Sequence, residues 1–404
     1  MKNIRKIMDN LYYIGCSDRK ISLFESVYPT PNGMSYNSYL LLDDKTALID
    51  GVDKTCDLQF YENLEGALNG RKLDYFIINH LEPDHSALIK EIIKKYKDVQ
   101  IVTTQKSVNM INQFFDIEQD KLNITIVKEG DKLEIGKHKL SFMLAPMVHW
   151  PEVMVTYDET DKILFSADAF GTFGAINGNL FDSEVDFMLQ IPEYSRYYTN
   201  IVGKYGLQVN SLLSKAKNLD IKMICPLHGL ILKEHISEII NNYHLWATYT
   251  PKVKSALILY ASVYGNTQNT AEIIANELSQ KGIKNIKMYD VSTTDHSYII
   301  SDVFNYSHII LLSTTYNNGI FVNMENLIRE IVSHNIQNRT FAIAENGSWA
   351  PVSGDLMKKE LETIKNTRFI ENKLTVKSSV KLNQLEEITN FVKAISEDIE
   401  HNSN

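Results

Sequence analysis

Cysteine is scarce in this sequence of 404 residues. Its three cysteines, Cys16, Cys56 and Cys225, are scattered, and none of them forms a C-x-x-C pair. A rubredoxin-type iron site or a thiolate zinc ribbon needs several paired cysteines, so neither is expected within this chain. Few and scattered thiols are typical of the reducing cytoplasm, and we expect a cytoplasmic protein.

Long apolar runs and a surplus of basic residues are also absent. No segment approaches the roughly 20 apolar residues that span a bilayer. The charged N-terminus is not followed by an apolar stretch of signal-peptide length. Lys and Arg number 41 against 50 Asp and Glu, a net charge of −9. We therefore expect neither a membrane nor a nucleic acid as a partner.

The composition is that of a globular protein, with 44% hydrophobic and 23% charged residues. At ~150 residues per domain, the length predicts two or three domains. The first half predicts mixed strands and helices, with strands at 39–42, 76–78, 124–127 and 163–165. From Lys254 the pattern predicts parallel βαβ units, with strands at 256–260, 286–289, 309–312 and 341–344 and a helix at 270–281. Pro251 would end an incoming helix, so we expect domains of 1–250 and 251–404.

An apolar strand leads directly into a predicted loop, His80-Leu-Glu-Pro-Asp-His85, which carries four side chains of metal-binding types. Alternate residues of an extended backbone project to the same side, so His80 and Glu82 can face one ion. Asp84 and His85, beyond Pro83, can face a second ion. Without a cation, such crowding of acidic groups after a buried strand brings no structural benefit. The segment therefore predicts a metal site that can hold two ions.

Three more candidates, His149, Asp168 and His228, each follow a predicted strand. Loops at one edge of a sheet commonly build an active site, although a single histidine or aspartate in a loop is more often solvated or a capping group. The carboxylates of Glu82, Asp84 and Asp168 favour iron or manganese over zinc. Asp168 comes from a separate loop and is the best candidate to bridge two ions, which would lie about 3.5 to 4 Å apart.

In the C-terminal half, three polar loops follow successive predicted strands. The first leads into a helix, whose N-terminus can bind a phosphate. It lacks the Gly-Lys-Ser/Thr of a triphosphate loop and the G-x-G-x-x-G of a dinucleotide site, which leaves a monophosphate. Small polar residues are also usual in ordinary turns. Three such loops at successive strand ends nevertheless favour FMN, as in the flavodoxin order. The candidate FMN contacts are Ser262, Val263, Tyr264, Gly265, Asn266, Thr267, Thr314, Thr315, Tyr316, Asn317, Asn318, Gly319, Asn346, Gly347, Ser348 and Trp349.

Over nearly its whole length the sequence resembles the flavodiiron proteins, also called A-type flavoproteins. The resemblance rests on the 80–85 motif, the three later metal candidates and the 262–267 loop. It implies a metallo-β-lactamase-like αββα sandwich with a non-haem diiron centre, followed by a flavodoxin-like doubly wound parallel sheet. By position it implies one iron held by His80, Glu82 and His149, the other held by Asp84 and His228, and Asp168 as the bridge. The equivalent of His85 either ligates the second iron or swings away.

The implied activity is reduction of dioxygen to water, of nitric oxide to nitrous oxide, or of both. Electrons would pass from an external donor, with rubredoxin the family expectation, through FMN to the two irons. The family pairs head to tail, which implies a homodimer or a dimer of dimers, and a chain without further extensions resembles its minimal class. Residues 31–39 would lie near the metal pocket. Tyr197 or Tyr198 is a candidate second-layer hydroxyl, although either can equally be a core or surface aromatic.

Two other functions remain open at this stage. A zinc-dependent hydrolase of metallo-β-lactamase fold, fused to a flavodoxin, would share the scaffold, but Glu82 stands where such enzymes usually offer a histidine. A plain electron carrier with a vestigial metal site is the other. The fold alone does not decide among them.

Overall fold

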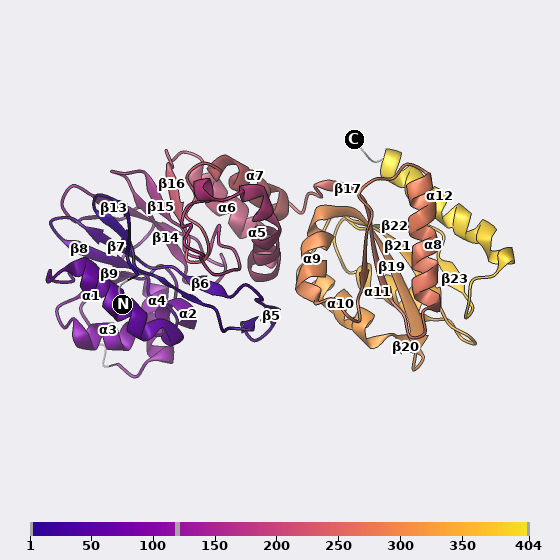
Figure 1. The fold of residues 1–404 in the computed structure, drawn as a ribbon, viewed down its shortest axis with the longest axis horizontal. Coiled ribbons are helices and arrows are strands. Elements are labelled where there is room, and N and C mark those ends of the chain that lie inside the picture. Colours follow the sequence, from indigo (N-terminus) through magenta and orange to yellow (C-terminus); the bar gives the residue numbers. More distant parts are fainter. Residues whose placement is uncertain (1–2, 118–121, 402–404) are drawn as a thin grey trace. The chain divides into compact units, whose positions relative to one another are not determined.

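The computed structural model describes residues 3–117 and 122–401 (Figure 1). The chain forms two compact units that divide between His244 and Leu245, near the end of helix α7 (Ile236–Ala247). Each unit has its own hydrophobic core. No helix in these described ranges is both long and apolar enough to span a membrane.

Two β-sheets face each other across the core of the N-terminal unit. The first has the strand order β1 (Arg5–Met8), β2 (Leu11–Tyr13), β7 (Tyr39–Leu42), β8 (Thr46–Ile49), β9 (Tyr75–Ile77), β10 (Gln100–Thr103) and β11 (Ile124–Ile126). The second has the order β12 (Lys132–Glu134), β13 (Lys139–Leu144), β14 (Met154–Asp158), β15 (Ile163–Phe165) and β16 (Met223–Cys225). Leu41 and Ile77 from the first sheet share one buried cluster with Phe142 and Phe165 from the second. Alternating apolar residues on facing strands thus build the sandwich core.

Helices connect and flank these sheets (Figure 1). In chain order they are α1 (Asp57–Leu68), α2 (Pro83–Ser86), α3 (Ile89–Lys95), α4 (Gln105–Phe114), α5 (Ile191–Tyr197) and α6 (Gly206–Ala216), followed by α7. Two small hairpin sheets, β3 (Cys16–Asp18) with β6 (Met34–Tyr36) and β4 (Leu23–Phe24) with β5 (Tyr28–Pro29), complete the unit. The sequence predicts a loop over residues 80–85, but Asp84 and His85 lie in α2. Proline suits a first helical position because its fixed φ is already helical, and Pro83 opens this helix.

The C-terminal unit is built on a parallel sheet with the order β18 (Lys287–Asp290), β17 (Val253–Ala261), β19 (Tyr306–Tyr316), β21 (Thr340–Asn346) and β22 (Arg368–Phe369). Strand β23 (Leu374–Val376) also pairs with β21, and β20 (Gly319–Ile320) turns back on β19. Helices α8 (Asn266–Gln280) and α12 (Leu385–His401) pack on one face, and α9 (His296–Asn305) and α10 (Val322–Ser333) lie on the other (Figure 1). Helix α11 (Ser353–Leu361) packs against α10 and β21. The predicted fold class, an αββα sandwich followed by a doubly wound sheet of flavodoxin order, is confirmed.

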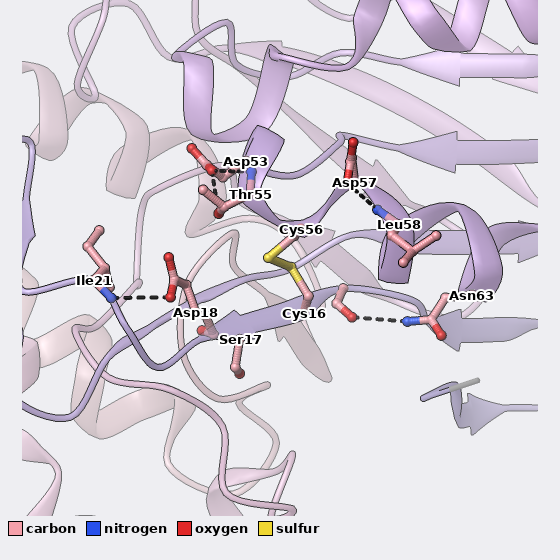
Figure 2. Close-up of a disulfide and its surroundings, with 12 residues drawn as sticks. Cys16, Ser17, Asp18, Ile21, Asp53, Thr55, Cys56, Asp57, Leu58 and Asn63 are labelled. Carbon is pink, nitrogen blue, oxygen red and sulfur yellow. Dashed lines mark hydrogen bonds between the residues drawn. A yellow bond between two sulfur atoms is a disulfide. The ribbon is translucent and has the colours of Figure 1, made fainter. Parts of the chain in front are cut away.

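Cys16 of β3 and Cys56 of the short helix η1 (Lys54–Cys56) form a disulfide (Figure 2). Their Cα atoms are 6.4 Å apart, although 40 residues separate them in the sequence. Asp53 caps η1 by accepting hydrogen bonds from the backbone N–H and the hydroxyl of Thr55. Cys225 is buried and free. The disulfide was not predicted from the sequence, because the three cysteines are scattered along the chain. Only the folded structure shows that Cys16 and Cys56 lie close together.

Candidate functional site

The seven candidate metal ligands come from four connections in the N-terminal unit. His80 and Glu82 follow β9, and Asp84 and His85 lie in α2 directly after them. The other three lie between β13 and β14, after β15 and after β16: His149, Asp168 and His228. Strands β15 and β16 run parallel, so Asp168 and His228 leave the same edge of their sheet. All seven side chains are buried.

His80, Glu82, His149 and Asp168 form the first ligand group. The Oε2 atom of Glu82 lies 3.3 Å from His80 Nε2 and 2.9 Å from His149 Nε2. The Oδ2 atom of Asp168 lies 3.1 Å from each of these two nitrogens. Two imidazole nitrogens and two carboxylate oxygens are therefore within reach of a single cation.

Asp84, His85 and His228 form the second ligand group. The Oδ2 atom of Asp84 lies 3.3 Å from His85 Nε2 and 3.2 Å from His228 Nε2. The two Nε2 atoms are 3.0 Å apart. A neutral imidazole offers one lone pair, so two such nitrogens beside a carboxylate can share one cation.

Asp168 contacts both groups through different oxygens. While its Oδ2 faces the first group, its Oδ1 lies 3.3 Å from His85 Nε2 and 3.4 Å from His228 Nε2. A carboxylate that bridges two metal ions uses its two oxygens in this way. The two groups thus form one cage, which we call the metal cage, with Asp168 at its centre.

The donors of the metal cage fit a pair of cations. Both carboxylate oxygens of Asp84 and of Asp168 are buried and, among the described residues, make no hydrogen bond. A buried carboxylate without donors is costly unless a cation compensates it. Three carboxylates with four imidazoles suit iron or manganese better than a hydrolytic zinc site.

The carboxylates and imidazoles of the cage shift each other's pKa values in opposite directions. Burial raises the pKa of Asp168, but the neighbouring His80 and the other imidazoles outweigh it and hold that pKa well below its usual range. Burial lowers the pKa of His149, but the carboxylates of Asp168 and Glu82 outweigh it and raise the pKa to about 9. In the protein alone, the carboxylates thus favour protons on His80, His85 and His149, and bound cations would replace those protons.

The outer nitrogens of the histidines have different partners. His80 Nδ1 lies 2.8 Å from the Oε1 atom of Glu152, whereas His228 Nδ1 lies 2.7 Å from the backbone oxygen of Ser35. Sequence reasoning missed both partners. Glu152 belongs to no motif. Ser35 contributes its backbone oxygen, and a contact of this kind cannot be inferred from the residue type.

Of the two tyrosine candidates, Tyr197 is the one beside the cage. Its ring centroid lies 5.6 Å from that of His228, and its buried hydroxyl has no hydrogen-bond partner in the described part of the chain. Tyr198 packs instead against Tyr243. Within residues 31–39, the ring of Tyr36 lies 5.8 Å from that of His228. Aromatic rings thus line one side of the cage.

A pocket of about 400 Å³ lies at the carboxyl ends of the central strands of the C-terminal unit. It includes the predicted contacts except Gly265 and Gly319, and it adds two residues that sequence reasoning missed, Ala350 and Ser378. Ser378 lies beyond β23, and its backbone N–H donates to Asn346 Oδ1. That pairing of distant segments, rather than any local motif, brings it to the pocket.

The pocket combines a helix N-terminus with exposed aromatic rings. Gly265 caps α8 with a φ of +86°, and its N–H donates to Ser262 Oγ at 3.0 Å. The N–H groups of the first turn of α8 can bind a phosphate. Tyr264 and Trp349 are 92% and 91% exposed, which is unusual for large rings and leaves their faces free for a flat ligand.

These features define a class of protein: an αββα domain with a two-metal cage, joined to a flavodoxin-type domain with a pocket at its strand ends. Family models agree, because residues 34–229 match the ODP family beta lactamase model and residues 258–372 match the flavodoxin model. A nitric oxide reductase of Moorella thermoacetica is 30% identical over 89% of this chain and 90% of its own length. An uncharacterized protein of Methanocaldococcus jannaschii is 36% identical over 79% of each chain.

Solved structures give the same result. A flavo di-iron protein from Thermotoga maritima superposes with a TM-score of 0.89 at 27% identity, over 99% of both chains. The rubredoxin oxygen:oxidoreductase of Desulfovibrio gigas shares the fold, with a TM-score of 0.93 at 24% identity over 98% of this chain and 99% of that one. The chain belongs to the flavodiiron protein family.

Proposed function

We propose that this protein is a flavodiiron oxidoreductase that reduces nitric oxide to nitrous oxide, dioxygen to water, or both. Electrons would enter from an external donor and pass through FMN to a non-haem diiron centre. The observation that carries the proposal is the metal cage, in which Asp168 contacts both ligand groups through separate oxygens. The relative named a nitric oxide reductase supports the same activity.

The described side chains fit both cofactors. His80, Glu82 and His149 would hold one iron, Asp84 and His228 the other, with His85 beside the second and Asp168 between them. When bound, two irons supply paired one-electron chemistry to a small ligand. The three carboxylates compensate ferric charge, and the ring of Tyr197 packs beside His228.

The C-terminal pocket would bind FMN. The first turn of α8, with Thr267, would bind the phosphate, and Thr267 Oγ1 lies 2.8 Å from Thr314 Oγ1 across the pocket. Tyr264, Tyr316 and Trp349 would cover the flat ring system. FMN transfers electrons singly or in pairs, which suits a site that feeds two metal ions.

The zinc-hydrolase alternative receives less support. The donor set includes Glu82 and has unpartnered carboxylate oxygens on Asp84 and Asp168, a set rich in oxygen ligands. A hydrolase would also have no use for a flavodoxin-type pocket. Iron-free, zinc-loaded protein with full turnover would nevertheless favour it.

We further propose a cytoplasmic enzyme that pairs head to tail as a homodimer or a dimer of dimers, with rubredoxin or a similar protein as donor. One symmetric patch can bring each subunit's flavin to its neighbour's metal ions in both directions.

Anaerobic turnover tests the proposal. Protein reconstituted with iron and FMN and reduced by a donor should consume nitric oxide, dioxygen or both, whereas zinc-loaded protein should consume no nitric oxide and only the dioxygen that reduced FMN consumes by itself. Equal consumption by the zinc form, or none by the iron form, would contradict the proposal.

A further inference from the structure

Glu152 is a buried carboxylate that contacts the metal cage from outside. It lies in the turn before β14, and its side chain is 0% exposed. Its Oε1 atom accepts a hydrogen bond from the backbone N–H of Leu81 at 3.0 Å and lies 2.8 Å from His80 Nδ1. Among the described residues, His80 is its only ion-pair partner, and its Oε2 atom has no hydrogen-bond partner. A buried charge with so few partners is costly, which points to a role toward His80.

In the second ligand group, no carboxylate of the described residues forms a hydrogen bond with the Nδ1 atom of either histidine. His228 Nδ1 faces the neutral backbone oxygen of Ser35 at 2.7 Å. His85 Nδ1 is buried and has no partner in the described ranges. His80 in the first ligand group therefore has a carboxylate at its outer nitrogen, whereas the two histidines of the second group have a neutral acceptor or, among the described residues, no acceptor.

This difference has a chemical consequence for a bound ion. An imidazole that donates Nδ1–H is fixed in the tautomer whose Nε2 lone pair faces the cage. A carboxylate acceptor also makes that imidazole a stronger electron donor than a carbonyl acceptor does. His80 should therefore stabilise a higher charge on its ion than His228 does.

We propose that Glu152 is a positioning residue that makes the two ions of the cage inequivalent. The ion beside His80 is bound more tightly and is harder to reduce than the ion beside His228. This inference rests on the proposed diiron function and goes beyond it, because it assigns different properties to the two ions.

The chain contains a matched control for this contact. His138 Nδ1 lies 2.8 Å from Asp158 Oδ2, and both residues are buried, so the pair repeats the His80–Glu152 contact outside the cage. Glu152→Gln and Asp158→Asn each replace the charge by an amide of the same shape. His138, Asp158 and Asp161 also form a third group of metal-ligand types, so the control is judged on the two binding steps of the cage, and only the first change should affect those steps.

Two readouts test the proposal on the full-length chain: anaerobic titration of metal-free protein with ferrous iron against a competing chelator, and a spectroscopic redox titration of the loaded protein. Glu152→Gln should weaken one of the two binding steps by about 10- to 100-fold. It should also raise the reduction potential of one iron and leave the other unchanged. Asp158→Asn should resemble the unaltered protein in both readouts.

Equal shifts of both steps, no shift, or the same shift in Asp158→Asn would overturn the inference. If Glu152→Gln does not fold, the unaltered chain provides the test, because two iron steps of equal affinity and equal potential also overturn it. In each of these cases the protein still binds two irons, so the proposed function stands. An unaltered chain that takes up no pair of irons would overturn both.

Discussion

At the residue scale, the cage depends most on Asp168, because among the described residues it is the one carboxylate whose oxygens face imidazole nitrogens of both ligand groups. Its two oxygens lie 3.1 to 3.4 Å from four imidazole nitrogens. Removing its charge affects both ions at once, whereas removing any other ligand affects one group first. A substitution of Asp168 therefore tests the two-metal cage more directly than a substitution of any other ligand.

Asp168→Asn keeps the side-chain shape and removes the negative charge. We expect the iron content to fall from two ions to one or none per chain, with FMN content unchanged. Turnover should fall by more than about 100-fold, since changes behind the ligands already cost 10- to 100-fold. Metal analysis and anaerobic assays measure this. Asp161→Asn, near His138 rather than the cage, is the control, and an equal loss there would refute the role of the bridge.

The sequence alone indicates the candidate metal ligands, but it does not indicate the residues that contact those ligands from outside the cage. The 80–85 motif concentrates four ligand types, and the later three each follow an apolar strand, so local patterns suffice to name them. Glu152 is close to His80 only in the folded chain, across 72 positions. Ser378 reaches the pocket of the C-terminal unit in the same manner, through its contact with Asn346. Such partners depend on tertiary packing, which no local pattern encodes.

At the element scale, the loop after β16 positions His228, and Gly229 determines its course. Gly229 has a φ of +80°, and a Cβ atom there would lie 2.2 Å from Thr172 Cγ2. Its N–H donates to Ser35 Oγ at 2.7 Å, and its carbonyl accepts from Asn37 Nδ2 at 2.9 Å. The loop therefore has no room for a side chain at this position.

Gly229→Ala should lower the free energy of unfolding by about 2–4 kcal/mol, from the left-handed backbone and the clash together. It should also weaken iron binding at the His228 side. Gly130→Ala is the control, because Gly130 has a φ of +81° with open space around it, and the backbone cost alone is about 1–2 kcal/mol. Denaturant unfolding measures both variants, and equal losses would contradict the account of the clash.

The disulfide between Cys16 and Cys56 joins β3 to η1 across a loop of 40 residues. A link of this kind commonly contributes about 2–4 kcal/mol to stability. We expect reductant to lower the melting temperature of the unaltered protein and to leave the double variant Cys16→Ser/Cys56→Ser unaffected. Thiol counting before and after denaturation reports the state of the pair. Three free thiols in freshly purified protein would show that the bond is absent in solution.

Most of the element pattern follows from the sequence, because strand and helix periodicities are local. The long strands β17, β19 and β21 contain the segments predicted for them. Short strands such as β3, β5 and β20 cannot be predicted from the sequence, because two or three residues are too few to show an alternating hydrophobic pattern. Their conformation is determined only by pairing with another strand. Helix α2, with its four residues, was missed for the same reason.

At the scale of the whole molecule, the function that we propose needs electron transfer between a flavin and a metal pair that belong to different units. Head-to-tail pairing would bring the flavin of each subunit to the metal ions of its neighbour. Activity per chain should then fall on dilution below the dimer dissociation constant and should recover on concentration. Sedimentation and turnover measured over the same concentration series test this. A monomer with undiminished activity would refute the pairing.

We propose that one cage holds two redox metal ions bridged by Asp168. X-ray absorption of the iron-loaded protein tests it most directly. We expect two irons per chain, nitrogen and oxygen ligands only, and an iron–iron distance of about 3.5–4 Å. A single isolated iron per chain, with no second metal at that distance, would contradict it.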